Sequence, residues 1–351
     1  MVSIYRLFFL ARLPVLLAGW FSVDAQQVNS DVSYERLVSR ADLTYTSPVV
    51  KSEEGIPIGN GTMGSLIWTT PTALHFQINR VDIFANNAST NNFYERHTDY
   101  CGGAGYVDID FSAGEDVFAS PQFRQHLSCY DGKVISDGNG VRTKAIAWMQ
   151  DDVMAIEVED NRSNPTPIFI HLRALRSALS RRGNHIAESD VQVDSKRIIL
   201  KQRFSEDSYF CNSSVGIAIA GRNGKAIIAN ETEGKIVVPA GNGKFIVFIA
   251  SDASFKQGED LAFKTTEKLR EAMEQGFDKL ARFNEQWWRD FWRKSYVHLH
   301  SDDGVADLVE KNYTYYLYVM ASSSRGKYPP KFNGMLWSTG GDVRKWGSLY
   351  W

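Results

Sequence analysis

The feature that most constrains the fold is a long block, residues 29–254, in which short stretches alternate between apolar and polar residues. The alternation recurs in segments 73–78, 107–111, 155–159, 168–172 and 245–248, and turns such as Asp131-Gly132 and Asn223-Gly224 separate such segments. A period of two predicts half-buried strands joined by hairpins. The absence of an amphipathic helical pattern alternating with them argues against a parallel βαβ fold. The block therefore predicts one large antiparallel β-sandwich with fewer than two helices of its own.

A helical pattern follows the strands, and we place the domain boundary near residues 251–258. Segment 258–300 is predicted to be a helical linker, because apolar residues recur between Leu261 and Lys294 at spacings of three, four or seven. We expect one long helix, with a potential kink at Gly276, that packs four residues on protein: Leu269, Met273, Phe277 and Leu280. In segment 301–351, Asp302-Asp303 offers an N-cap for a helix over Val305–Ser323.

Residues 1–25 have the features of a secretory leader. They contain Arg6 and Arg12, then the apolar run Leu13–Val23, then small residues at the positions that a signal peptidase reads before Ala25. This pattern predicts a signal peptide that is cleaved after Ala25. An N-terminal membrane anchor is the alternative, but a span needs about 20 apolar residues and this run is shorter. We expect a secreted or periplasmic protein with no membrane span.

Charge and cysteine content exclude several classes of function. The chain has 39 Lys and Arg against 41 Asp and Glu, so it lacks the basic excess that holds a phosphate backbone, and nucleic acid is not an expected partner. Cys101, Cys129 and Cys211 allow at most one disulfide bridge. Segment 95–101 contains Glu, His, Asp and Cys, but no partner ligands at zinc spacing accompany it. We therefore predict no metal and no other cofactor.

A glycine-rich turn, PIGNGTMG at residues 57–64, opens into the strand predicted at 65–70. No Lys follows the glycines and no helix follows the turn, so a phosphate-binding loop fits poorly, whereas a tight turn that requires positive φ fits well. Amide and charged side chains follow the next strand: Gln77, Asn79, Arg80 and Asp82. Such groups suit sugar hydroxyls, which need paired donors and acceptors. Ordinary solvation of a loop is the alternative.

Six of the nine tryptophans lie between Trp287 and Trp351. Those on the predicted helix are expected to serve packing, whereas Trp337 and Trp346 lie in glycine-rich loop sequence, where an aromatic face can stack on a sugar ring. The candidate carbohydrate-binding residues are therefore Asn60, Asn79, Asp82, Trp337 and Trp346. We expect these five residues to approach one another at one end of the sandwich.

Three stretches together are similar to a known family: GIPIGNGTMGSLIW followed by LHFQINRVDIF, then FNEQWWRDFWRKS, then KFNGMLWSTGGDVRKWGSLYW. They resemble the N-terminal part of secreted glycoside hydrolases like family 95, the α-L-fucosidase type, and are most similar to an uncharacterised branch with the same N-terminal domain. The resemblance covers nearly all of residues 34–351. The fucosidase-type sequence usually reads PIGNGRLGAMVFG and then LNEDTLW. Here QINRVDIF replaces the second motif, so Asn79 and Asp82 match only loosely.

The resemblance implies a large N-terminal β-sandwich, a helical linker and an (α/α)6 toroid that carries the active site. In such enzymes the acidic catalytic residues lie beyond the part that matches residues 332–351, so we expect an incomplete toroid and assign no catalytic residue. Hydrolysis needs a carboxyl group on each side of the sugar, so we expect this chain itself not to hydrolyse glycosides.

The implied function is therefore the N-terminal domain of an exported glycoside hydrolase that acts on plant or host polysaccharide or glycan. The alternative is a non-catalytic carbohydrate-binding or adhesin-like β-sandwich. Such a binding module would not need the long Trp-rich helix or the start of a toroid, and this difference favours the first interpretation.

Overall fold

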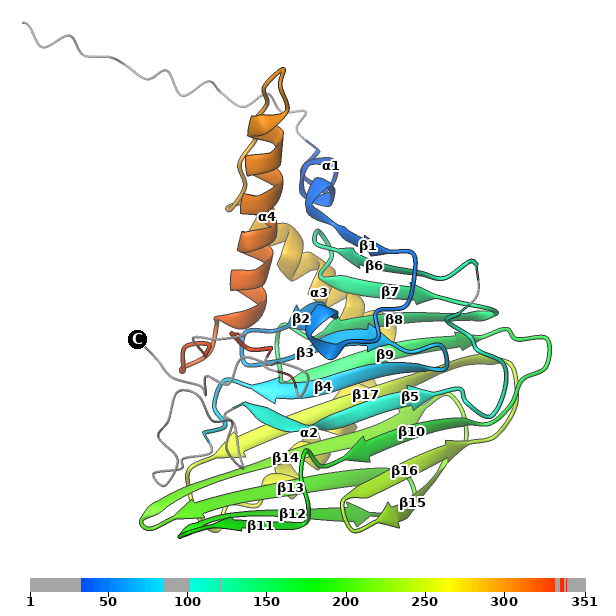
Figure 1. Cartoon of the computed structure of the whole chain (residues 1–351), viewed down its shortest axis with the longest axis vertical. Coiled ribbons are helices and arrows are strands. Elements are labelled where there is room, and N and C mark those ends of the chain that lie inside the picture. Colours follow the sequence, from blue (N-terminus) through cyan, green and yellow to red (C-terminus); the bar gives the residue numbers. More distant parts are fainter. Residues whose placement is uncertain (1–32, 85–101, 120, 332–334, 338, 340–351) are drawn as a thin grey trace, which may run out of the picture. The chain divides into compact units, whose positions relative to one another are not determined.

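The computed structural model describes residues 33–84, 102–119, 121–331, 335–337 and 339. Its strands form two antiparallel sheets (Figure 1), which confirms the predicted sandwich. The larger sheet has ten strands in the order β1-β6-β7-β8-β9-β17-β14-β13-β12-β11. Their bounds are β1 Leu43–Tyr45, β6 Arg124–Ser128, β7 Lys133–Asp137, β8 Val141–Ala147, β9 Val153–Asp160, β11 Leu179–Arg182, β12 His185–Val193, β13 Arg197–Glu206, β14 Tyr209–Ala220 and β17 Gly243–Ser254.

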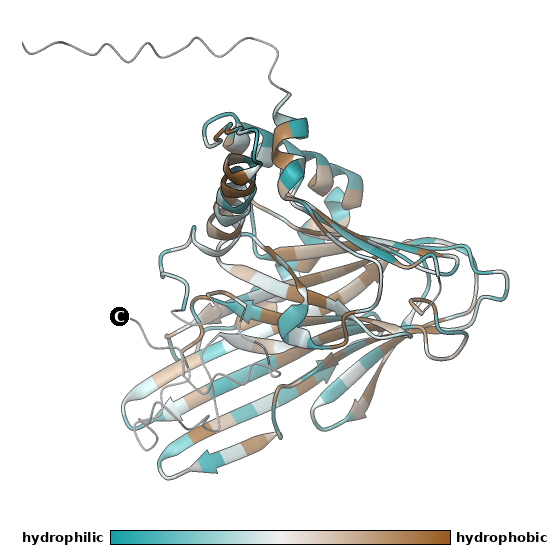
Figure 2. Cartoon of the chain, turned by 45° about the horizontal axis from the view of Figure 1, so that its top comes forward, coloured by the Kyte–Doolittle hydropathy of each residue, from teal (hydrophilic) through white to brown (hydrophobic). Residues whose placement is uncertain are grey.

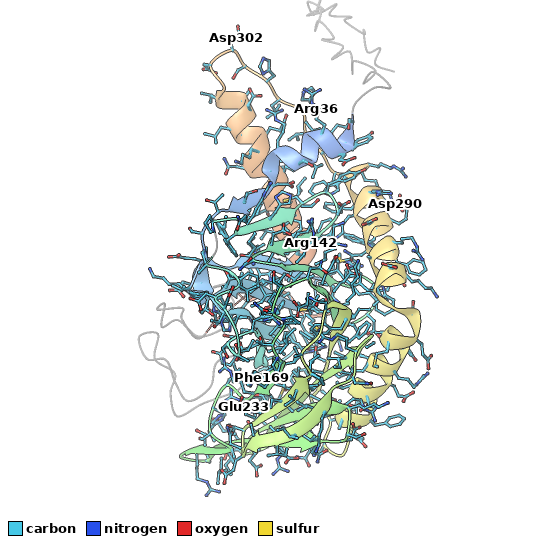
Figure 3. The ribbon with its side chains drawn as sticks, turned by 90° about the vertical axis from the view of Figure 1, so that its right-hand side faces the viewer. Arg36, Arg142, Phe169, Glu233, Asp290 and Asp302 are labelled. Atoms are coloured by element: carbon cyan, nitrogen blue, oxygen red, sulfur yellow. The ribbon has the colours of Figure 1, made fainter. Side chains whose placement is uncertain are left out.

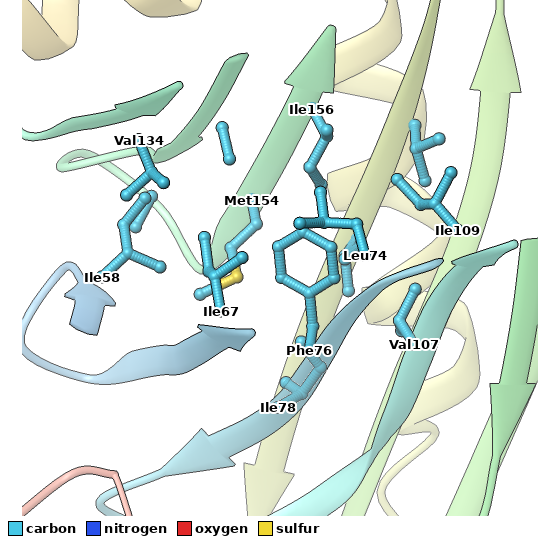
Figure 4. Close-up of a cluster of buried hydrophobic side chains, with 14 of the residues drawn as sticks. Ile58, Ile67, Leu74, Phe76, Ile78, Val107, Ile109, Val134, Met154 and Ile156 are labelled. Carbon is cyan, nitrogen blue, oxygen red and sulfur yellow. The ribbon is translucent and has the colours of Figure 1, made fainter. Parts of the chain in front are cut away.

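The smaller sheet has seven strands in the order β15-β16-β10-β5-β4-β3-β2. Their bounds are β2 Ile56–Gly59, β3 Met63–Thr69, β4 Ala73–Arg80, β5 Gly103–Asp110, β10 Ile168–Arg173, β15 Lys225–Asn230 and β16 Glu233–Val238. The alternation in the sequence sets which face of each strand is buried. Phe76 and Ile78 of β4 lie in one buried cluster with Met154 and Ile156 of β9, so the core lies between the two sheets (Figure 4).

Helical structure is scarce among the described residues of the strand block, as expected. The short helix α1 spans Tyr34–Val38, and two 3₁₀ turns follow it: η1 Ser39–Ala41 and η2 Ser52–Glu54. This segment lies beside the C-terminal helices, because Arg40 forms ion pairs with Asp307 and with Glu310.

Two helices cover the outer face of the ten-stranded sheet (Figure 3), where the sequence predicted one long helix. Helix α2 spans Leu261–Gln275 and helix α3 spans Phe277–Trp292. Gly276 separates them with a φ of +74°, a conformation that glycine adopts without strain, so the predicted kink is a break. Leu269 and Leu280 are fully buried against the sheet. The predicted packing face is thereby confirmed.

Helix α4 spans Val305–Ser323, the predicted range. Its N-cap is Gly304, with a φ of +75°, rather than the predicted Asp302-Asp303 pair. Asp303 still assists the first turn, because its Oδ1 accepts a hydrogen bond of 3.0 Å from the N–H of Val305. None of the helices in the described part of the chain combines the length and the hydropathy that crossing a bilayer requires.

Candidate functional site

The candidate site lies at the end of the sandwich where β4 and β17 end and the β2–β3 turn lies; we call it the Arg80 end. Asn60 holds the turn in place. Its Oδ1 accepts hydrogen bonds from the N–H groups of Thr62 and Met63, at 3.0 and 2.8 Å. Its Nδ2 donates to the carbonyls of Trp148 and Asp151, at 3.2 and 2.8 Å. The buried Asn60 side chain therefore joins the turn to the loop between β8 and β9.

The glycines of this turn allow the segment after α4 to lie directly against it. A Cβ atom at Gly61 would lie 2.3 Å from Cβ of Arg325, and one at Gly64 would lie 2.6 Å from a methyl carbon of Leu336. Gly61 also has a φ of +90°, so the predicted requirement for positive φ is confirmed. The motif at residues 57–64 is thus both a tight turn and a packing surface for the C-terminal segment.

Arg80, at the end of β4, is the buried centre of an ion-pair network. Its guanidinium donates to both carboxylate oxygens of Asp82 at 2.8 Å, to Oδ2 of Asp152 at 2.9 Å and to the carbonyl of Ser251 at 3.0 Å. Burial acts to lower the pKa of Arg80, but Asp152 and Asp82 outweigh it and raise that pKa above its usual value. The network links the ends of both sheets and keeps the arginine charged.

Lys268 of α2 extends this network to the helical layer. Its Nζ lies 3.5 Å from Asp152, 3.5 Å from Asp151 and 3.3 Å from Asp252. Burial acts to raise the pKa of Asp152, but Arg80 and Lys268 hold it below its usual range. An acidic group that is held ionised in this way cannot act as a general acid near neutral pH. The network can therefore position groups and bind polar ligands, but Asp152 cannot supply acid catalysis.

Four of the five candidate binding residues lie among the described residues, and the structure brings them to the same end. Asn79 is fully buried, and its Oδ1 accepts a hydrogen bond of 3.2 Å from Gln77. Asp82 is partly exposed beside Arg80. Trp337 is only 8% exposed, and its indole N–H donates to the carbonyl of Ile58 at 2.9 Å.

The sugar-binding role of these residues stays a prediction, because most of their polar atoms bond within the protein. The fifth, Trp346, lies outside the described residues, as do the metal-capable groups at 95–101. Among the residues that the structure describes, no group of three His, Cys, Asp or Glu side chains could hold a metal ion.

The sequence did not predict the position of Arg325, which follows α4. Its guanidinium lies 4.3 Å from the ring centre of Trp287 in α3, and its Nη1 donates to the carbonyls of Asn60 and Met149 at 3.2 and 3.1 Å. Burial lowers the pKa of Arg325. Arg325 thus links α3, the β2–β3 turn and the β8–β9 loop. No periodic pattern surrounds it in the sequence, so only its place between Ser324 and Gly326 gave any indication of a loop.

A second group that the sequence did not indicate is an aromatic cluster of three rings from distant segments: Phe84 after β4, Phe255 after β17 and Tyr328 after α4. Their ring centres lie 5.8 to 6.0 Å apart, at distances typical of favourable aromatic packing. Phe255 is 37% exposed, so the cluster presents an aromatic surface next to the ionic network. These rings, rather than the buried Trp337, supply accessible aromatic area at this end.

Comparison with known proteins gives a family of unknown function and solved structures that share the fold. The sequence profile of a family described as "Domain of unknown function (DUF5703)" matches residues 44–232. No curated protein sequence matches the chain significantly. A human-microbiome structure assigned as a kojibiose phosphorylase is similar in fold, with a TM-score of 0.52 and 12% identity. This match covers 81% of the chain but 42% of that structure, so the chain spans about two fifths of its length.

Two more distant structures are also similar in part. One is a family GH92 inverting mannosidase from Bacteroides thetaiotaomicron, with a TM-score of 0.43, 12% identity, and 83% of this chain and 40% of that chain covered. The other is a bacterial glucoamylase with acarbose, with a TM-score of 0.36, 10% identity, and 82% and 44% covered. At these identities the likeness concerns the fold alone.

Proposed function

The chain belongs to the DUF5703 family, and from that premise we propose that it is the sandwich part of an exported enzyme that cleaves glycosidic bonds. The fold that it shares with a protein assigned as a kojibiose phosphorylase supports this class of activity. Export rests on the leader-like residues 1–25. The sequence motifs resemble those of α-L-fucosidases, so α-L-fucosides are the first substrates to test.

The observation that carries the proposal is an apolar face of α4 that no described residue covers. Five large side chains on this helix are exposed, at spacings of three, four, eight and eleven residues from the first: Val305, Leu308, Val309, Tyr313 and Tyr316. Exposure reaches 58% at Val305 and 60% at Leu308. In Figure 2, hydrophobic residues of this helix are brown and alternate with paler and hydrophilic ones. A contiguous apolar face of this kind marks an interaction surface, and we propose that further helices of a catalytic domain pack on it.

The Arg80 end contacts the C-terminal turn of the same helix. The N–H of Gly61 donates to the carbonyl of Ser322, in the last turn of α4, at 2.8 Å. The β2–β3 turn and the segment after α4 would therefore border a helical domain on α4 and contribute polar and aromatic contacts to its substrate cleft. In this arrangement the acid and the base come from the helical domain, because the described carboxylates nearest Arg80 are held as ion pairs.

The test is to read the genomic frame after Trp351 and, where it continues, to express the extended protein and compare it with the 351-residue chain; a stop codon directly after Trp351 would contradict the proposal. Aryl glycosides, including α-L-fucosides, and disaccharides with and without inorganic phosphate are the substrates. We expect turnover from the extended protein alone. Turnover by the purified 351-residue chain would contradict the proposed division of roles.

A paired substitution tests the surface itself. Leu308→Asp with Tyr316→Asp should lower the melting temperature of the 351-residue chain only slightly, through the weaker helix propensity of Asp, but should destabilise the extended protein much more. Phe263→Asp on α2, equally exposed but away from α4, is the control and should be neutral in both. If the α4 pair has the same small effect in both proteins, no helices pack on this face.

The ion pairing at the Arg80 end also favours a second candidate, a carbohydrate-binding protein without catalysis. Paired carboxylates can accept hydrogen bonds from sugar hydroxyls without transferring protons. In that case the extended protein would bind glycans in the same panel but would not turn them over.

A further inference from the structure

A groove with a volume of about 540 Å³ lies on the outer face of the ten-stranded sheet, between strands β11–β14 and the first turn of α2. This volume falls within the range of about 300–1,000 Å³ that is usual for small-ligand sites. Strand register places one row of side chains across the groove: Leu179, Glu188, Arg203 and Asn212. The groove is thus built from different residues than the Arg80 end.

The charged residues of the groove are exposed ion pairs. Nε of Arg203 lies 2.7 Å from Glu188, and Nζ of Lys201 lies 3.0 Å from Asp190. Pairs that are this exposed contribute little to folding, because water solvates both partners. Their donors and acceptors can therefore turn toward a ligand without loss of stability. Each pair offers one donor and one acceptor side by side, the arrangement that a vicinal diol can bridge.

Asn212 gives an independent indication of a ligand. Its Oδ1 is buried and has no hydrogen-bond partner among the described residues. A buried acceptor without a partner is costly, and proteins normally satisfy such atoms. Because Asn212 lines the groove, a rotation of its side-chain amide would bring this oxygen within reach of a hydroxyl of a molecule bound there.

The lining also indicates the class of ligand. Four carboxylates line the groove with two cations, Glu188, Asp190, Glu259 and Asp260 against Lys201 and Arg203, and Lys264 outside the lining is ion-paired with Glu259. This acidic excess disfavours an anion. Both cations are already paired, and Asp260 is engaged as the N-cap of α2, where it accepts a hydrogen bond from Phe263. The uncharged lining is half polar, with side chains such as Ser189 and Ser213, and half apolar; Leu179 in the apolar half is 59% exposed and suits the C–H face of a sugar ring.

We propose that this groove binds a neutral oligosaccharide, as a second site that is separate from the Arg80 end. The ligand class rests on the proposed function. Asn212 accepts a hydrogen bond from one hydroxyl, the two ion pairs bridge others, and Leu179 contacts the ring. Such a site would hold the enzyme on a polymeric substrate while the catalytic domain acts elsewhere on it.

The test is calorimetric titration of the full chain with maltotetraose and mannotetraose, and with oligogalacturonate and chitosan tetramers as charged counterparts. We expect binding of a neutral tetramer, weakened at least tenfold by Asn212→Ala and by Arg203→Met. Asn212→Ala should not lower the melting temperature, because it removes an acceptor that has no partner in the described structure. Arg197→Met is the matched control: this arginine also forms an exposed ion pair on β13, with Asp194, outside the groove.

The other outcomes overturn the inference in distinguishable ways. Equal binding by wild type, Asn212→Ala and Arg203→Met would place the site elsewhere and leave the proposed function intact. Preference for a charged tetramer would refute the neutral ligand class. No binding of any tetramer would refute the site, and turnover by the extended protein would then decide the proposed function separately.

Discussion

Gly61→Ala tests whether the glycine-rich turn at residues 57–64 is needed for the segment after α4 to pack against it. Gly61 has a φ of +90°, and an added Cβ would lie 2.3 Å from Cβ and 2.7 Å from the backbone N of Arg325. Neither atom belongs to the flexible end of the side chain, so relief requires the backbone after α4 to move. We therefore expect the C-terminal segment to be displaced, together with the contact between Arg325 and Trp287.

The magnitude follows from two terms. An alanine at positive φ costs about 1–2 kcal/mol, and forcing a methyl into a filled space costs about 1–3 kcal/mol, so the free energy of unfolding should fall by roughly 2–5 kcal/mol. Gly304→Ala is the control, because Gly304 has a φ of +75° but no heavy atom within 4 Å of an added Cβ. Gly304→Ala should therefore lower the free energy of unfolding only by the cost of alanine at positive φ, about 1–2 kcal/mol.

The assay is urea unfolding followed by tryptophan fluorescence, with trypsin digestion as a second probe. We expect cleavage after Arg325 and Lys327 to be faster in Gly61→Ala than in Gly304→Ala, because only the first displaces that segment. Arg325→Ala should not rescue Gly61→Ala, since the Cβ and backbone of residue 325 remain. If both glycine variants lose the same stability and are cleaved equally fast, the packing argument is refuted.

Three further predictions concern stability. Burial raises the pKa of Asp42 to about 6, so the stability that protonated Asp42 contributes is complete below about pH 4 and is lost as the pH rises through 6. In thermal unfolding, Asp42→Asn should therefore match the wild type near pH 4 and be about 1–2 kcal/mol more stable than it at pH 8. Asp152→Ala should cost about 3–5 kcal/mol in urea, because it removes a partner of buried Arg80, and a loss below about 1 kcal/mol would contradict this role. Leu269→Ala, at a fully buried position under α2, should cost about 2–5 kcal/mol, whereas Leu308→Ala on the exposed face of α4 should be neutral.

Much of the fold could be predicted because its signals are local. Alternation in β4 at Leu74, Phe76 and Ile78 predicts which side chains enter the core, and all three do. The bounds of α4 followed from its apolar spacing in the same way. Gly276 shows the limit of such signals: a glycine within a continuous helical pattern is compatible with a kink or a break. The positive φ of Gly276, which makes it a break, is not encoded in the apolar spacing on either side.

The candidate site was harder to predict, because its partners are distant in sequence. Asn60 has an amide that could bind a sugar hydroxyl, but that amide donates hydrogen bonds to the carbonyls of Trp148 and Asp151, about ninety residues later in the chain. Trp337 lies in loop sequence that suggested exposure, yet the absence of a side chain at Gly64 lets it pack against β3. A single sequence shows which groups a residue carries. It does not show which distant segments of the same chain form hydrogen bonds or contacts with those groups.

The place of β17 in the larger sheet has a consequence for biosynthesis. This strand pairs with β9 on one side and β14 on the other, and it joins the meander that ends at Asp160 to the one that ends at Ala220. Until Gly243 and the residues after it leave the ribosome, β9 has an edge without its partner. At about 5–20 residues per second, that interval lasts roughly 4–17 s. The nascent chain therefore carries an unpaired apolar strand edge for many seconds, the period in which a chaperone would protect it most.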